Sequence, residues 1–127
     1  MNVLLDTNRL TDVLRGDSDV RAVAERASII VIPFIALAEI RAGFLLGRRR
    51  RENEAALSRF LALPGVDVVF ADHETTEVYA RLFVYLRNAG TPIPTNDLWI
   101  ASIATQHHLL LLTRDAHFQN LPQILKA

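Results

Sequence analysis

The chain has 127 residues, half of them apolar, with no cysteine and a formal net charge of zero. This length predicts a single domain over residues 1–127, and the missing cysteines exclude disulfides, thiolate metal sites and cysteine nucleophiles. No apolar run approaches the roughly 20 residues that cross a bilayer, and the first residues lack a secretory signal pattern, so we expect a cytoplasmic protein without membrane contact. Because the charges balance, any binding to nucleic acid must come from a local basic patch.

The first half of the chain alternates between strand and helix patterns. An apolar strand over 2–6 ends in Asp6-Thr7-Asn8, and a short helix follows that Gly16 stops. A second short helix leads to a β-branched strand over 28–32, which Pro33 ends. Helices are predicted over 34–46 and 54–63, and a third strand over 66–70.

The second half continues the same alternation. Asp72 opens a long helix that reaches residue 88 or 89, with Gly90 as its terminator. The two prolines of 91–95 require a loop, and a helix over 96–107 and a fourth strand over 109–113 follow it. Strands separated by helices imply right-handed crossovers and a covered parallel sheet. The sequence therefore predicts the α/β class, as a three-layer α/β/α sandwich with a central, mostly parallel sheet.

Four acidic residues fall at places where these elements can bring them together. Asp6 ends the first strand and Asp115 follows the fourth by two residues, so both lie at one sheet edge. Asp97 begins a helix that packs on the sheet, and Glu39 lies in an apolar helix, where a charge needs an exposed face or a ligand. Each acid also has an ordinary reading as an exposed side chain, a helix cap or a turn residue. We expect the four to converge.

Four carboxylates in one cleft repel one another, so they either raise each other's pKa values or bind a cation. Oxygen ligands without histidine or cysteine suit Mg²⁺ or Mn²⁺, and Mg²⁺ usually shares its coordination with a substrate phosphate. The acids therefore point to metal-dependent hydrolysis of phosphodiester bonds.

The acids lie in four short motifs: Leu4-Leu5-Asp6-Thr7-Asn8, Ala38-Glu39-Ile40 with Gly43, Asn96-Asp97-Leu98-Trp99-Ile100-Ala101, and Thr113-Arg114-Asp115 with His117-Phe118. In this order and spacing they resemble the motifs of PIN-domain nucleases, specifically the VapC-like toxins of type II toxin–antitoxin pairs, over essentially the whole chain. Arg9 departs from the resemblance, because the family more often carries an apolar residue there.

The resemblance implies a metal-dependent endoribonuclease that is inhibited by a cognate antitoxin bound in or near the acidic groove. It implies that the acids form the catalytic and metal-binding site and that three polar residues support them. The implied acids are Asp6, Glu39, Asp97 and Asp115, and the supporting residues are Thr7, Asn8 and Thr113. His117 could touch substrate, although a structural role is favoured for it.

The only dense basic run lies between two predicted helices and consists of Arg48, Arg49, Arg50 and Arg51. One interpretation is a solvated start of a helix, partly compensated by Glu52 and Glu54. Another is that these arginines bind RNA phosphates, which would supply the local basic patch that nucleic-acid binding requires here. A third is contact with an acidic segment of the antitoxin.

The long helix carries two adjacent apolar stripes, made of Val78, Leu82, Tyr85 and Leu86 and of Tyr79, Phe83 and Leu86. Together they are broader than a helix on a sheet requires, which predicts a homodimer.

Two other classes of protein are alternatives to the nuclease. A phosphate-accepting signalling module needs paired acids after the first strand and a lysine after a late strand, but the only lysine is Lys126. A catalytically inactive PIN-fold binding module is disfavoured because all four acids are present.

Overall fold

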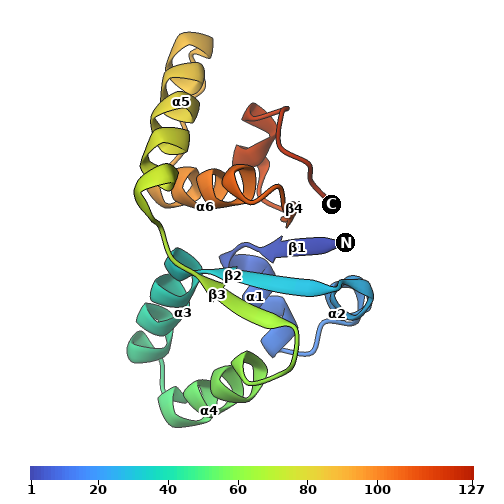
Figure 1. Ribbon diagram of the computed structural model, residues 1–127. Helices are drawn as coiled ribbons and strands as arrows, with labels where there is room; N and C mark the ends of the chain where they lie inside the picture. The colour runs from blue at the N-terminus through green and yellow to red at the C-terminus, as the bar shows by residue number, and fades with distance from the viewer.

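The computed structural model describes all of residues 1–127 and shows a four-stranded sheet with helices on both faces (Figure 1). The strands are β1 (Asn2–Leu5), β2 (Ile29–Pro33), β3 (Val66–Val69) and β4 (Leu110–Leu112). Their order is β3-β2-β1-β4, and every neighbouring pair is parallel. The predicted three-layer α/β/α sandwich is confirmed.

Six α-helices and one 3-10 helix connect and follow the strands: α1 (Thr7–Leu14), α2 (Ser18–Arg26), α3 (Phe34–Leu46), α4 (Arg50–Leu61), α5 (His73–Ala89), α6 (Thr95–Gln106) and η1 (Ala116–Asn120). None of these helices is both long and apolar enough to span a bilayer. Local signals set several of the ends. Asp72 caps α5 in a capping box with Thr75, and Gly90 ends that helix in the left-handed conformation that glycine adopts most readily.

The predicted helix over 54–63 is wrong at both ends, because α4 begins at Arg50 and ends at Leu61. Arginine is a good helix former, and Glu52 lies in the first turn, where a negative charge is favourable beside the helix dipole. Arg50 and Arg51 therefore belong to the helix, and Gly65, with a φ of 83°, forms the turn before β3.

Successive strand residues face opposite sides of the sheet, and each side has its own apolar core. Leu4, Val31 and Leu111 pack under α5, α6 and η1, whereas Val3 and Ile32 pack against the layer that contains α1, α2, α3 and α4. Figure 1 shows these two groups of helices above and below the sheet, with α5 extending beyond it. Both faces of the sheet are covered, which is why β2 and β4 contain no polar residue.

The strand order reverses at β1, which has β2 on one side and β4 on the other. Open parallel sheets bind ligands beyond the carboxyl ends of the strands at such a reversal. Asp6 follows β1 directly, and its backbone N–H donates to the carbonyl of Leu112 in β4 at 3.3 Å. The fold thus places the ends of β1 and β4 side by side at the edge where a ligand site is expected.

Candidate functional site

Asp6 lies at the junction of β1 and α1 and is only 3% exposed. One of its carboxylate oxygens caps α1 by accepting the N–H of Arg9 at 2.9 Å, and the other accepts the hydroxyl of Thr113. Burial raises the pKa of Asp6 above its ordinary value and the nearby Asp115 raises it further, while the Thr113 hydroxyl acts in the opposite direction. Asp6 is therefore both a helix cap and a charged group beside a second acid.

Thr113 links the two acids that follow neighbouring strands. Its hydroxyl donates to Asp6 and also accepts the backbone N–H of Asp115 at 3.0 Å. Asp115 in turn caps η1 by accepting the N–H of His117 at 2.9 Å. One hydroxyl therefore fixes the end of β4 relative to the end of β1.

Asp97 lies in the first turn of α6 and faces the same centre. The Nδ1 atom of His117 is 2.8 Å from an Asp97 oxygen and 3.1 Å from an Asp115 oxygen. Burial raises the pKa of Asp97, and the charges of Asp115 and Glu39 add to the rise, while the hydrogen bond with His117 opposes it. Asp97, Asp115 and Glu39 are therefore close enough for their charges to act on one another.

Glu39 lies on the exposed side of α3, where one of its oxygens accepts the hydroxyl of Thr7 at 2.7 Å. Its charge acts on Asp97, so Glu39 borders the acidic centre from α3. Asn8 is exposed on α1 and makes no side-chain hydrogen bond.

The tightest group of potential metal ligands consists of Asp97, Asp115 and His117, whose ligand atoms all lie within 4.8 Å of one another. Asp6 and Glu39 are not members of this group. The Thr113 hydroxyl connects Asp6 to Asp115, because it bonds the Asp6 carboxylate and the backbone N–H of Asp115. Glu39 lies beside the group and accepts the hydroxyl of Thr7. Two carboxylates and an imidazole nitrogen form a donor set that a divalent cation can use.

The sequence reasoning favoured a structural role for His117 and expected no histidine among the ligands. The structure places its ring between two of the acids. Its position two residues after Asp115 was the available signal, but the contact with Asp97 depends on how η1 and α6 pack.

A second charged cluster, missed from the sequence, supports the loop after β4. Asp12 is buried on α1, and its carboxylate accepts Arg114 at 3.1 Å and Arg9 at 3.4 Å. Since Arg114 stands between Thr113 and Asp115, this ion pair holds the loop that carries both groups against α1. Arg9 stands where the family more often has an apolar residue, and in this structure its guanidinium pairs with Asp12.

The long helix uses only part of its apolar surface inside the molecule. Val78, Leu82 and Leu86 are buried, while Phe83 and Tyr85 remain 46% and 42% exposed. These exposed aromatic side chains lie on the helix that extends beyond the sheet in Figure 1. An apolar surface of this kind is typical of an interface with another chain.

Known proteins match this chain along nearly all of its length. The PIN domain family matches residues 3–124. Toxin FitB of Neisseria gonorrhoeae is 31% identical over 89% of this chain and 87% of its own length. Ribonuclease VapC1 of Haemophilus influenzae is 27% identical over 98% of this chain and 95% of its own.

Solved structures give the same result. VapBC2 from Rickettsia felis, bound to a DNA fragment from its promoter, superposes with a TM-score of 0.86 at 26% identity over 100% of this chain and 98% of that chain. The match along the sequence, the matching fold and the acidic centre at the strand ends agree with one another. The chain belongs to the PIN domain family.

Proposed function

We propose that this protein is a metal-dependent endoribonuclease toxin that hydrolyses RNA phosphodiester bonds and is inhibited by a cognate antitoxin. The names of its relatives, a toxin and a ribonuclease, and the similar structure of a VapBC assembly support this activity. The observation that carries the proposal is the convergence of Asp97 and Asp115 around His117, beside the Asp6–Thr113 pair.

Asp6, Glu39, Asp97 and Asp115 are proposed as the catalytic and metal-binding residues. Asp97 and Asp115 would hold Mg²⁺ or Mn²⁺ together with Asp6, and Glu39 would border the site from α3. A divalent cation held there supplies neutralisation of the scissile phosphate and activation of water.

Neighbouring side chains orient these acids. Thr113 donates to Asp6 and fixes the backbone of Asp115, while Thr7 donates to Glu39. His117 contacts Asp97 through Nδ1, which fixes the direction of that carboxylate. Asn8, exposed on the first turn of α1, is free to contact substrate.

The reaction itself is hydrolysis at phosphorus. The oxygen of a water molecule bonds to the scissile phosphorus, the bond between phosphorus and the 3′ oxygen breaks, and a proton from the water ends on that 3′ oxygen. One product then carries a 5′-phosphate, and the other carries a 3′-hydroxyl. A 2′,3′-cyclic phosphate product would instead mean that the ribose hydroxyl attacks, and it would exclude this mechanism.

Asp97→Asn tests the proposal, because it removes one anionic ligand and conserves the shape of the side chain. The variant should fold and lose RNA cleavage in Mn²⁺. Metal should also raise the melting temperature of the wild type, by a stabilisation of about 2.7 kcal/mol at a hundredfold excess over Kd, and this response should shrink in the variant.

Asp17→Asn is the matched control, because Asp17 caps α2 away from the acidic centre and asparagine is an equally good cap. It should cleave RNA and respond to metal like the wild type. Full activity in Asp97→Asn would remove Asp97 from the site. A wild type that cleaves no RNA, with Mn²⁺ or with chelator, would favour an inactive binding module.

We further propose that the protein forms a homodimer through α5. The exposed Phe83, Val84 and Tyr85 support this interface, since they leave apolar surface on a helix whose other side is already buried.

A further inference from the structure

A cavity of about 530 Å³ opens beside the acidic centre between α1, α3 and α4. Thr7 and Glu39, which hydrogen-bond each other at the centre, form part of its lining. Arg15, from the end of α1, and Arg49, from just before α4, also line it. A ligand that reaches the acids can therefore extend directly into a space that contains two guanidinium groups.

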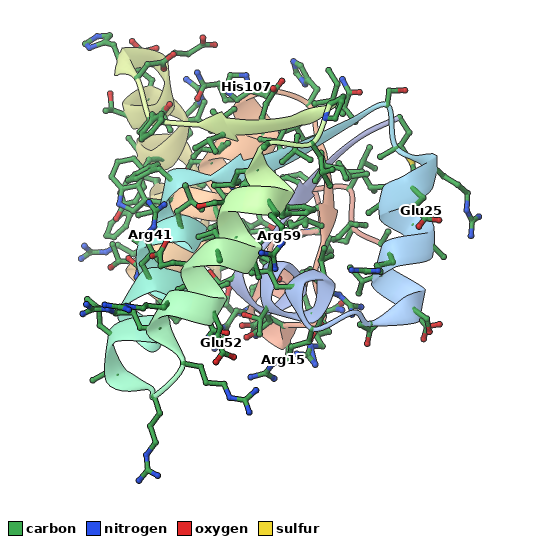
Figure 2. All side chains as sticks on the ribbon, turned by 90° about the horizontal axis from the view of Figure 1, so that it is seen from below. Arg15, Glu25, Arg41, Glu52, Arg59 and His107 are labelled. Atoms are coloured by element: carbon green, nitrogen blue, oxygen red, sulfur yellow. The ribbon has the colours of Figure 1, made fainter.

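The hollow continues along the same layer. A second hollow of about 240 Å³ shares Leu14 and Ala56 with the first and adds Arg21 and Arg59. We name these two neighbouring hollows, with Arg15, Arg21, Arg49 and Arg59 in their lining, the arginine groove. Figure 2 shows Arg15 and Arg59 on the same side of the molecule, where α1 and α4 lie against each other.

These arginines keep most of their charge available to a ligand. Arg15, Arg21 and Arg59 form no ion pair, and Arg49 has only a contact of 4.0 Å with Glu52, in which both side chains are at least three-quarters exposed. By contrast, Arg9, Arg41 and Arg114 are paired with carboxylates at 3.4 Å or less.

Each hollow also contains an aromatic side chain, Phe44 in the first and Phe60 in the second. Guanidinium groups bind phosphates, and aromatic rings stack on bases without regard to sequence. Cations and partly exposed rings in the same lining fit a single nucleic-acid strand, whose backbone and bases each need a partner.

We propose that the RNA strand on one side of the cleaved bond lies along the arginine groove, with Arg15 and Arg49 holding the phosphates nearest the acidic centre. The inference rests on the proposed ribonuclease function. It assigns RNA contact to Arg49 alone among the four residues of the basic run, because Arg48, Arg50 and Arg51 do not line the groove.

The physical need for such a site follows from the acids themselves. The carboxylates of the acidic centre carry the same sign of charge as the phosphates that flank the scissile one, so they repel those phosphates. Arg15 and Arg49, which line the same cavity as Glu39, offset that repulsion for the phosphates that enter the groove.

The test measures binding of a fluorescein-labelled, random-sequence single-stranded RNA to full-length protein that carries Asp97→Asn, by polarisation over a range of salt. Arg15→Gln with Arg49→Gln should reduce the slope of log Kd against log salt by about 1.4, since each lost phosphate contact on a single strand contributes about 0.7. Arg48→Gln with Arg51→Gln removes the same charge outside the groove and should leave the slope unchanged. Arg49→Gln alone replaces a side chain that is 78% exposed, so this variant should fold normally. Its slope should fall by about 0.7.

Equal slopes for the groove variant and its control would overturn the inference. So would unchanged RNA binding combined with lost binding of the cognate antitoxin, because that result would make the groove a protein site. Cleavage by the otherwise wild-type protein is measured in parallel. If it cleaves RNA, a negative result concerns the groove alone; if it does not, the proposed function fails first.

Discussion

Thr113→Val tests the geometry of the site most directly. The Thr113 hydroxyl donates to one oxygen of Asp6 and accepts the backbone N–H of Asp115 at 3.0 Å. Valine keeps the branched shape of the side chain and removes both hydrogen bonds. Because Asp6 is only 3% exposed, water cannot readily replace the lost donor.

The size of the effect follows from these two contacts. A hydrogen bond to a charged group contributes about 1.5–3 kcal/mol, and one between neutral groups about 0.5–1.5 kcal/mol. Thr113→Val should therefore lower the free energy of unfolding by about 2–4.5 kcal/mol at neutral pH. For a domain of this length the melting temperature should fall by about 7–17 °C.

The effect should depend on pH in a defined direction. The hydroxyl lowers the pKa of Asp6 against the larger effect of burial, so its removal raises that pKa further. Thr113→Val is therefore most destabilising where Asp6 is ionised. The loss shrinks as the pH falls through the folded-state pKa of Asp6, because a protonated carboxyl no longer needs this donor.

Urea unfolding of metal-free protein at neutral and mildly acidic pH measures both effects. Thr113→Ser keeps the hydroxyl and should remain close to the wild type. If Thr113→Val were as stable as the wild type at neutral pH, or if serine were as damaging as valine, the hydroxyl would not hold Asp6 as described.

Two further predictions concern the whole protein. Burial raises the pKa values of Asp6 and Asp97, so the metal-free protein should lose stability as the pH rises through their folded-state values; urea unfolding with chelator across that range checks this, and rising stability would contradict it. The exposed aromatic residues of α5 predict a dimer in sedimentation, and Tyr85→Glu should shift it toward monomer; a monomeric wild type would exclude this interface.

Local patterns determined much of the fold. The apolar run over 34–46 predicted α3 with its observed bounds, and Asp72 and Gly90 marked the two ends of α5. These features depend on helix periodicity and capping, which act within a few residues of the chain. Where such signals were weak, as at the start of α4, the predicted boundary was wrong.

The sequence also identified the acids and the sheet edge, since residues that follow parallel strands meet at one edge. Which side chains pair there was decided by the packing of distant segments. Thr113 bonds Asp6 across 107 positions, Arg114 reaches Asp12 across 102, and His117 meets Asp97 across 20. The sequence shows none of these contacts, because each depends on the placement of β4 beside β1 and of η1 against α6. The arginine groove has the same origin, since its lining comes from helices that only the folded chain brings together.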